Sequence, residues 1–331
     1  MESTTFGAAL VETCVSAAVA APSIHNTQPW RFGLDPETAT FEVRADPERG
    51  LRHADPTGRA LLLSVGACVF NLRVALTHFG RPPVTRLLPS PDDPGLLATV
   101  RPAGFPAELT AGQGEERRVD LYEAIWRRHS SRFPFTSRPL PAAVRDELAA
   151  VALAEGASLR FSEEVDTTRM LRLTAEAERR NRLDAHRAAE GRHWVHRELE
   201  PAPDAGLPRT ALGPQDARER LPLRDFTAQR HPERLIARPF EDAPVIAALT
   251  TDHDRRIDWL RAGQALERVW LVATAHGVRA SVLHQPVEWA DLRDALADAC
   301  DGTAHPQLLM RLGYGPEGPA TPRRTPGREQ W

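Results

Sequence analysis

Lysine is absent from this chain of 331 residues, and arginine supplies all 42 of its permanent cations. The absence excludes Schiff-base chemistry and a lysine general base. Any anion site must therefore use arginine, histidine or backbone N–H groups. The formal net charge is only −3. This lack of a basic excess argues against a nucleic-acid partner, whose phosphates require a strongly positive surface.

Cysteine is scarce as well. Cys14, Cys68 and Cys300 are far apart and form no C-x-x-C pair, so neither a disulfide framework nor a structural zinc site is indicated, and a reducing cytosol is expected. The alanine-rich run 6–21 faintly resembles a signal peptide, but Glu12 interrupts it and no arginine precedes it. No apolar run approaches the ~20 residues of a membrane-spanning helix. The sequence therefore predicts a cytoplasmic protein without a membrane partner.

Several generic motifs do not carry a function. The segment 313–318 has the spacing G-x-G-x-x-G, but a proline-rich tail follows it, where a dinucleotide site needs a helix. His193 and His196 have the spacing of metal ligands without an obvious third ligand, and a solvated helix face is the favoured interpretation. The acidic segment 252–254 is interpreted as a turn at the end of a strand. No metal site is therefore predicted, and no G-x-S-x-G motif indicates a serine hydrolase.

Two segments of the chain resemble each other. Apolar residues spaced alternately by three and four predict helices over about 57–79 and 258–277, and each helix ends at a glycine that a strand follows. An ungapped alignment gives the identical pairs Leu63 and Leu260, Gly66 and Gly263, Thr77 and Thr274, Gly80 and Gly277, and Pro89 and Pro286. Buried helices of similar period share some identities by chance, but the common order of helix, glycine, strand and proline favours an internal duplication.

The duplication and the remaining patterns predict the domain organisation. Residues 102–118 are interpreted as the connection between a first half, 1–118, and a second half, 119–331. Residues 162–240 contain a charged helical stretch and then a proline-rich segment, which predicts an insertion across the surface. Helices mixed with antiparallel-looking strands, such as those expected at 243–252 and 307–315, indicate an α+β fold.

Three segments offer groups that could bind a ligand. In an extended segment Arg128, Ser130 and Arg132 would point the same way and form a phosphate site, although a solvated arginine cluster is the alternative. Residues 21–30 form a polar loop after a helix, which is otherwise an ordinary helix end and turn. The tail offers Arg323 and Arg324, either as a phosphate clamp or as a disordered basic end.

Together these residues resemble the nitroreductase-like flavoprotein superfamily, and more closely its branch with fused repeats, the Acg family of FMN-binding proteins. The resemblance covers nearly the whole chain apart from the proline-rich part of the insertion. Its most specific motif is P-S-x-x-N-x-Q-P-W, and R-x-S-x-R, Pro-x-Glu and a basic tail accompany it. The matching residues are Pro22, Ser23, Asn26, Gln28, Pro29 and Trp30; Arg128, Ser130 and Arg132; Pro286, Val287 and Glu288; and Arg323 and Arg324.

The resemblance implies a nitroreductase-like fold in which two fused halves form a pseudo-dimer with a lid-like insertion. Ordinary members are homodimers whose flavins lie between subunits. Here the first half has only the P-S-x-x-N loop, and the second half has the other motifs. One complete flavin site per chain is therefore expected, and the chain is compatible with either a monomer or a dimer.

The resemblance also implies roles for the matching residues. The FMN phosphate is assigned to Arg128, Ser130, Arg323 and Arg324, and Arg132 is the candidate partner for the negative charge of reduced flavin. Backbone N–H groups of the segment Gln285–Glu288 are expected near the flavin N5 and O4 atoms. Ordinary members have glycine where this chain has Trp289, so this loop is expected to differ. No side chain is expected to act as a catalytic acid or base.

Two functions follow from the resemblance. The first is an FMN-dependent oxidoreductase that transfers electrons from NAD(P)H to a nitroaromatic, a quinone or a similar acceptor. The alternative is a protein that sequesters or stores FMN, with the insertion closing the flavin site and little turnover. A hydrolase or regulator without flavin is the remaining alternative.

Overall fold

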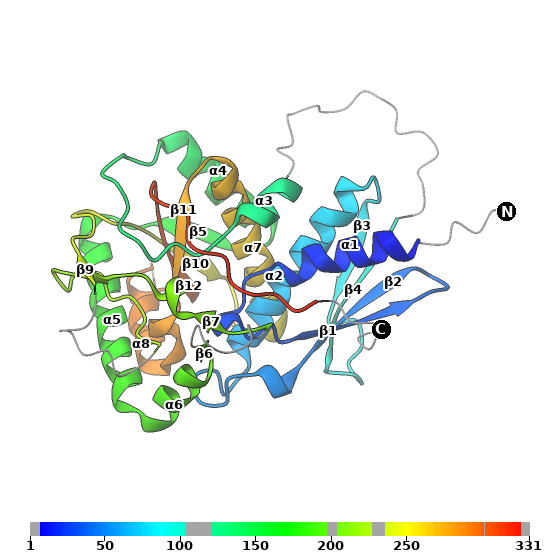
Figure 1. Cartoon of the computed structure of the whole chain (residues 1–331), viewed down its shortest axis with the longest axis horizontal. Coiled ribbons are helices and arrows are strands. Elements are labelled where there is room, and N and C mark those ends of the chain that lie inside the picture. The colour runs from blue at the N-terminus through cyan, green and yellow to red at the C-terminus, as the bar shows by residue number, and fades with distance from the viewer. Residues whose placement is uncertain (1–6, 104–120, 197–203, 227–235, 301, 326–331) are drawn as a thin grey trace.

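The computed structural model describes residues 7–103, 121–196, 204–226, 236–300 and 302–325, and the structural statements below concern these residues. They form helices packed on two four-stranded antiparallel sheets, which confirms the predicted α+β class (Figure 1). The first half contains α1 (Ala8–Val19), η1 (Ile24–Asn26), β1 (Trp30–Asp35), β2 (Thr40–Ala45), η2 (Pro47–Arg49), α2 (Arg59–His78), β3 (Pro83–Leu87) and β4 (Leu96–Pro102).

The second half contains the other sheet. Its elements are α3 (Leu121–Arg127), α4 (Ala142–Ala154), β5 (Ser158–Phe161), β10 (Val245–Thr251), α7 (Arg256–Ala275), β11 (Arg279–Leu283), η5 (Gln285–Glu288), α8 (Ala290–Asp298) and β12 (His305–Gly313). The predicted insertion contributes α5 (Glu164–Leu183), α6 (Ala185–His193), β6 (Val195–His196), β7 (Leu207–Pro208), η3 (Arg209–Leu212), β8 (Gln215–Asp216) and β9 (Ala237–Arg238).

Helices α2 and α7 pack against each other between the two sheets (Figure 1). They meet at Gly66 and Gly263. A Cβ atom on Gly66 would collide with the backbone oxygen of Leu260, and one on Gly263 would collide with that of Leu63. Leu63 packs in the core of the second half, while Leu260 packs in the core of the first. This reciprocal pattern is what a two-fold axis produces.

The two sheets also have corresponding strand orders. The strand order β3-β4-β2-β1 in the first sheet matches β11-β12-β10-β5 in the second. The same hydrogen bond ends both central helices: the Arg81 N–H donates to Leu76 O and the Val278 N–H to Ala273 O, each at 2.8 Å. These observations support the internal duplication, which we retain as a proposal. The proposed boundary at residue 118 lies outside the described residues.

The close contact of α2 and α7 should be sensitive to a single added methyl group. Gly66→Ala should lower the free energy of unfolding by about 1–3 kcal/mol, because the new methyl group forces two backbones apart. Urea unfolding followed by circular dichroism measures this change. Gly95→Ala is the control, since its Cβ would meet only Asp93 Oδ1 at 3.5 Å, an ordinary contact. Equal stability of the two variants would contradict the close approach of α2 and α7.

The insertion does more than cross the surface. The inner face of α5 buries Met170 against Ile246, Leu283 and Leu309, and so covers the second sheet. Its polar outer face agrees with the predicted surface position. In the central layer, α2 is long and apolar enough to span a bilayer by composition, which corrects the expectation that no apolar run approaches this length. Most of α2 is buried inside the protein, as is typical of a core helix.

Candidate functional site

Two cavities lie where the two halves meet. The larger comprises about 820 Å³ of unfilled space and the smaller about 440 Å³, in both cases including space that is open to solvent. They are contiguous, because both are lined by Pro22, Ser23, His25, Ser130 and Arg132. The P-S-x-x-N loop of the first half and the R-x-S-x-R segment of the second half therefore border one shared space.

The larger cavity is mainly apolar. Helix α2 contributes Leu63, α7 contributes Leu266 and Trp270, and β12 contributes Leu308. These residues line the cavity because the close contact of α2 and α7 brings both helices beneath it. Such a chamber suits a flat, largely apolar ring system.

The smaller cavity is cationic. Arg128 donates to Ala20 O at 2.9 Å, and Arg323 donates to the same oxygen at 3.2 Å and to Asn26 Oδ1 at 2.8 Å. Burial, together with the charge of Arg128, lowers the pKa of Arg323 to about 9. Two guanidiniums held together in a buried space favour an anionic ligand, whose charge would offset their repulsion.

A buried carboxylate stands behind this cationic pocket. Glu267 of α7 is fully buried, with Oε1 3.1 Å from Arg128 Nε. Burial raises the pKa of Glu267 to about 7, although the nearby positive charge of Arg128 opposes the change. Glu267 could not be recognised from the sequence, because a single glutamate on an apolar helix carries no motif.

The second prediction follows from Glu267. Its raised pKa means that folding favours the protonated carboxyl group, so this stabilisation is complete below pH 4.5 and is lost as the pH rises to about 7. The free energy of unfolding in urea should fall between about pH 5 and about pH 8. This fall should be larger in the wild type than in Glu267→Gln, by the order of 3 kcal/mol. The same pH dependence in both proteins would contradict the assignment.

The loop after α1 has an unusual backbone. His25, Asn26 and Gln28 have φ angles of 51°, 56° and 51°, a left-handed conformation that residues other than glycine seldom adopt. The loop is held by hydrogen bonds from Gln28 N to Ser23 Oγ at 2.9 Å and from Asn26 Nδ2 to Pro322 O at 2.9 Å. Such clustered strain is typical of functional sites.

Residues 204–226 of the insertion, hereafter the strap, cross the cavities. Asn26 exchanges two hydrogen bonds with Gly206, at 2.8 and 3.0 Å, and Arg132 donates to Ala211 O at 2.8 Å. Strap residues form part of both walls: Leu223, Arg224 and Phe226 in the larger cavity, and Leu207 in the smaller. The insertion therefore covers the shared space.

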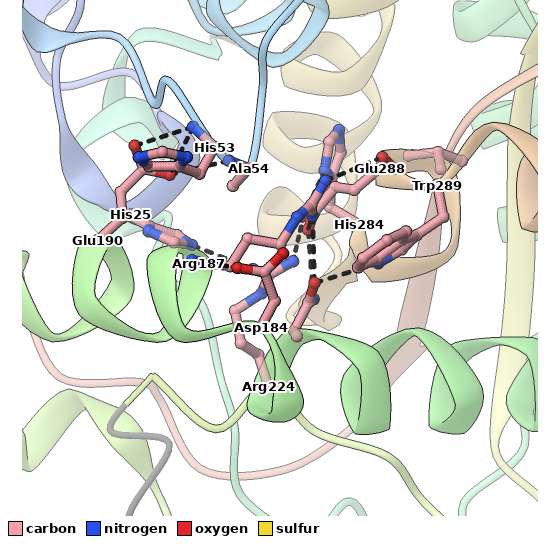
Figure 2. A network of polar contacts seen from close by, with 12 residues as sticks. His25, His53, Ala54, Asp184, Arg187, Glu190, Arg224, His284, Glu288 and Trp289 are labelled. Atoms are coloured by element: carbon pink, nitrogen blue, oxygen red, sulfur yellow. Dashed lines mark hydrogen bonds and ion pairs between the residues drawn. The ribbon is translucent and has the colours of Figure 1, made fainter.

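The strap is anchored by a buried polar network around Glu288 (Figure 2). The fully buried Glu288 carboxylate pairs with Arg224 of the strap, with Arg187 of α6 at 3.4 Å and with His284 Nδ1 at 3.0 Å. Burial alone would raise the pKa of Glu288, but Arg224 and the His284 hydrogen bond lower it to about 2. The network thus joins the strap, the insertion helices and η5 through one carboxylate.

The predicted site residues fall into two groups. Those that line the cavities are Pro22, Ser23, Asn26, Arg128, Ser130, Arg132 and Arg323. Those outside the cavity linings are Gln28, Gln285, Pro286, Val287, Glu288 and Arg324. Gln28 instead donates to Asp204 O at 2.8 Å and accepts from Arg324 N at 2.9 Å, which ties the strap to the tail. The expected flavin contacts of the segment Gln285–Glu288 stay predictions, since residues 281–284 form that wall of the larger cavity.

Several lining residues were not predicted from the sequence. His25 was available within the P-S-x-x-N motif itself, and His129 within R-x-S-x-R. Arg224 and Phe226 follow the proline-rich part of the insertion, in a short stretch that has no periodic signal. Within the described part of the chain, no group of three or more histidine, cysteine, aspartate or glutamate residues could hold a metal ion.

Comparison with known proteins identifies the class. The sequence pattern of the Nitroreductase family matches residues 125–314. A putative NAD(P)H nitroreductase of Mycobacterium tuberculosis is 35% identical over 321 residues, which are 95% of this chain and 89% of that protein. The putative NAD(P)H nitroreductase acg of the same species is 30% identical over 324 residues, or 95% and 93% of the two chains. The chain therefore belongs to the nitroreductase family.

Similar proteins are also found more widely. The probable NAD(P)H nitroreductase PigM of Serratia is 27% identical over 355 residues, or 98% of this chain and 93% of its own. Among solved structures, a nitroreductase with bound FMN from Bacteroides fragilis has 14% identity and a TM-score of 0.38, covering 63% of this chain and 95% of its own. Family membership makes the protein an oxidoreductase.

Proposed function

We propose that this chain binds one FMN in the two joined cavities and uses it to transfer electrons from NAD(P)H to a nitroaromatic, a quinone or a similar small acceptor. The observation that carries the proposal is the shared space, which has a cationic end and an apolar chamber and is bordered by both halves. Family membership and the names of the mycobacterial relatives, which are putative NAD(P)H nitroreductases, support it further.

The residues fit the two parts of FMN. A phosphate monoester carries roughly −1.5 to −2 charges at neutral pH, which the guanidiniums of Arg128 and Arg323 and the hydroxyl of Ser130 would bind in the smaller cavity. The ring system would lie in the larger cavity, against Leu63, Trp270 and their apolar neighbours. The role proposed for Arg324 would need it to turn from Trp30 O, to which it now donates at 3.3 Å.

Arg132 and the strap would set the electrostatic environment of the bound cofactor. Bound FMN supplies the two-electron chemistry itself. Arg132 borders both cavities, and it is held by Ala211 O and by the Phe226 ring, whose centroid lies 5.0 Å from the guanidinium carbon. Its positive charge would favour the negatively charged reduced state of the cofactor. The strap forms part of the wall of the same space and would reduce the access of water, which would strengthen this electrostatic effect.

Storage of FMN is the second candidate function, and the position of the strap favours it. Leu223, Arg224 and Phe226 form a wall of the larger cavity, and a nicotinamide would need them to move. The test is to mix the yellow protein with NADPH under anaerobic conditions and follow the flavin absorbance. Rapid bleaching supports the reductase and excludes storage. An absence of bleaching over hours, with rapid bleaching by dithionite, supports storage, and faster bleaching in Phe226→Ala would identify the strap as the barrier.

A further inference from the structure

His25 occupies a special position in the wall of the site. It lines both cavities and also a third of about 350 Å³ beneath the strap. Its side chain is buried, and its left-handed φ of 51° holds the residue in the tight turn of η1. The ring meets Phe226 edge-on, with centroids 5.1 Å apart. None of the roles described above uses this histidine.

The neighbours of His25 determine which ring nitrogen carries the proton. Nε2 lies 3.2 Å from Arg224 Nη1, and Figure 2 shows the two side chains facing each other. A guanidinium can only donate, so Nε2 must accept and the neutral ring carries its proton on Nδ1. Among the described residues, the buried Nδ1 atom has no hydrogen-bond partner. A buried donor without a partner is unfavourable, and a bound ligand would supply the missing acceptor.

The charges around His25 keep its ring neutral. Burial and the positive charge of Arg224 lower its pKa to about 3, with Glu288 acting in the opposite direction and His284 and Arg132 in the same direction as Arg224. Over the neutral pH range His25 therefore offers a fixed N–H dipole and no exchangeable charge. This property distinguishes a hydrogen-bond donor from a catalytic acid.

We propose that His25 is a specificity-determining residue whose Nδ1–H donates a hydrogen bond to a carbonyl or nitro oxygen of the molecule bound in the cavities that this histidine lines. The inference rests on the proposed function. The accepting oxygen belongs either to the flavin ring or to the electron acceptor, and the recognition chemistry is the same in both cases. Because the donor is neutral, its contribution is constant from about pH 6 to about pH 9.

Three substitutions separate the two ring nitrogens. In His25→Asn the amide group replaces Nδ1, and asparagine tolerates the left-handed backbone. In His25→Gln the amide reaches the position of Nε2, so the contact with Arg224 is kept and the Nδ1 donor is lost. His25→Phe removes both. The control is His276→Gln, which changes a histidine that is hydrogen-bonded to Glu147 at 2.8 Å and lines none of these cavities.

The experiment compares FMN affinity and the anaerobic reoxidation of dithionite-reduced holoprotein by duroquinone and by ferricyanide, which offers no carbonyl or nitro oxygen. If the flavin is the partner, Gln and Phe at position 25 weaken FMN binding at least about tenfold and Asn retains most of it. If the acceptor is the partner, FMN binding stays unchanged, and Gln and Phe slow duroquinone reduction about tenfold but leave the ferricyanide rate unchanged.

Other outcomes overturn the proposal. Wild-type behaviour of His25→Phe in both assays would exclude a donor role. A pattern in which Gln is tolerated and Asn is not would assign His25 the structural role of holding Arg224. A dependence of the effect on pH between about 6 and 9 would contradict the neutral donor. Failure of the wild-type chain to bind FMN would refute the proposed function, and this outcome is recognised before any variant is compared.

Discussion

The double variant Arg128→Ala with Arg323→Ala should lose its flavin during purification. Both guanidiniums border the smaller cavity, and both donate to Ala20 O although they lie far apart in the sequence. A hydrogen bond to a charged group contributes about 1.5–3 kcal/mol, so the loss of two predicts FMN binding weaker by roughly 10²–10⁴-fold. Flavin-to-protein absorbance ratios and titration with FMN measure the effect.

The matched control removes two arginines from the surface. Arg31→Ala with Arg44→Ala changes the net charge equally, but these side chains are 52% and 39% exposed and lie on the first sheet, outside the cavity linings. This double variant should keep its flavin. The phosphate assignment would be abandoned if both double variants retained flavin equally, or if both lost it equally.

The second large effect is expected at Glu288. Glu288→Gln leaves Arg224 and Arg187 buried without their carboxylate, and breaking a buried ion pair in this way costs about 3–5 kcal/mol. The free energy of unfolding in urea should fall by about this amount. Because Arg224 belongs to the strap, the strap should also loosen, and limited proteolysis should cut it sooner than in the wild type.

Asp242 provides the control for this prediction. It also pairs with two arginines, Arg218 and Arg220, but it is 74% exposed. Exposed ion pairs contribute only about 0–1 kcal/mol, so Asp242→Asn should unfold almost like the wild type. Similar losses at the two positions would show that burial does not make the Glu288 network special.

The sequence was most informative where one physical signal dominated. Helices α2 and α7 were predicted because their apolar residues repeat with the helical period, and their common ending reflects the glycines at 80 and 277. Strands β10 and β12 were predicted because both are buried runs of apolar residues. Strand β4 was not predicted. It ends at Pro102, where the segment interpreted as the connection between the halves begins.

The site was predictable only in part, because some of its residues belong to sequence motifs and others are brought to it by the fold. Ser23, Asn26 and Arg128 were found because each belongs to a short motif that can be recognised in the sequence alone. Arg224 and Phe226 line the larger cavity through contacts across the fold, which a short stretch without periodicity does not indicate. Glu288 was found through a motif, but its side chain is engaged by the insertion, so the motif did not reveal its contacts.

Segments that are distant in the sequence surround one space, and this should affect how the protein retains flavin in dilute solution. Residues from the segments 22–26 and 128–132, together with Arg323, border the same cavity and belong to one polypeptide. Where separate subunits supply such walls, dilution parts them and the cofactor is released. In this chain the covalent connection maintains a high local concentration of each wall for the other. The fraction of sites carrying flavin should therefore depend on free FMN alone, and stay constant over any range of protein concentration.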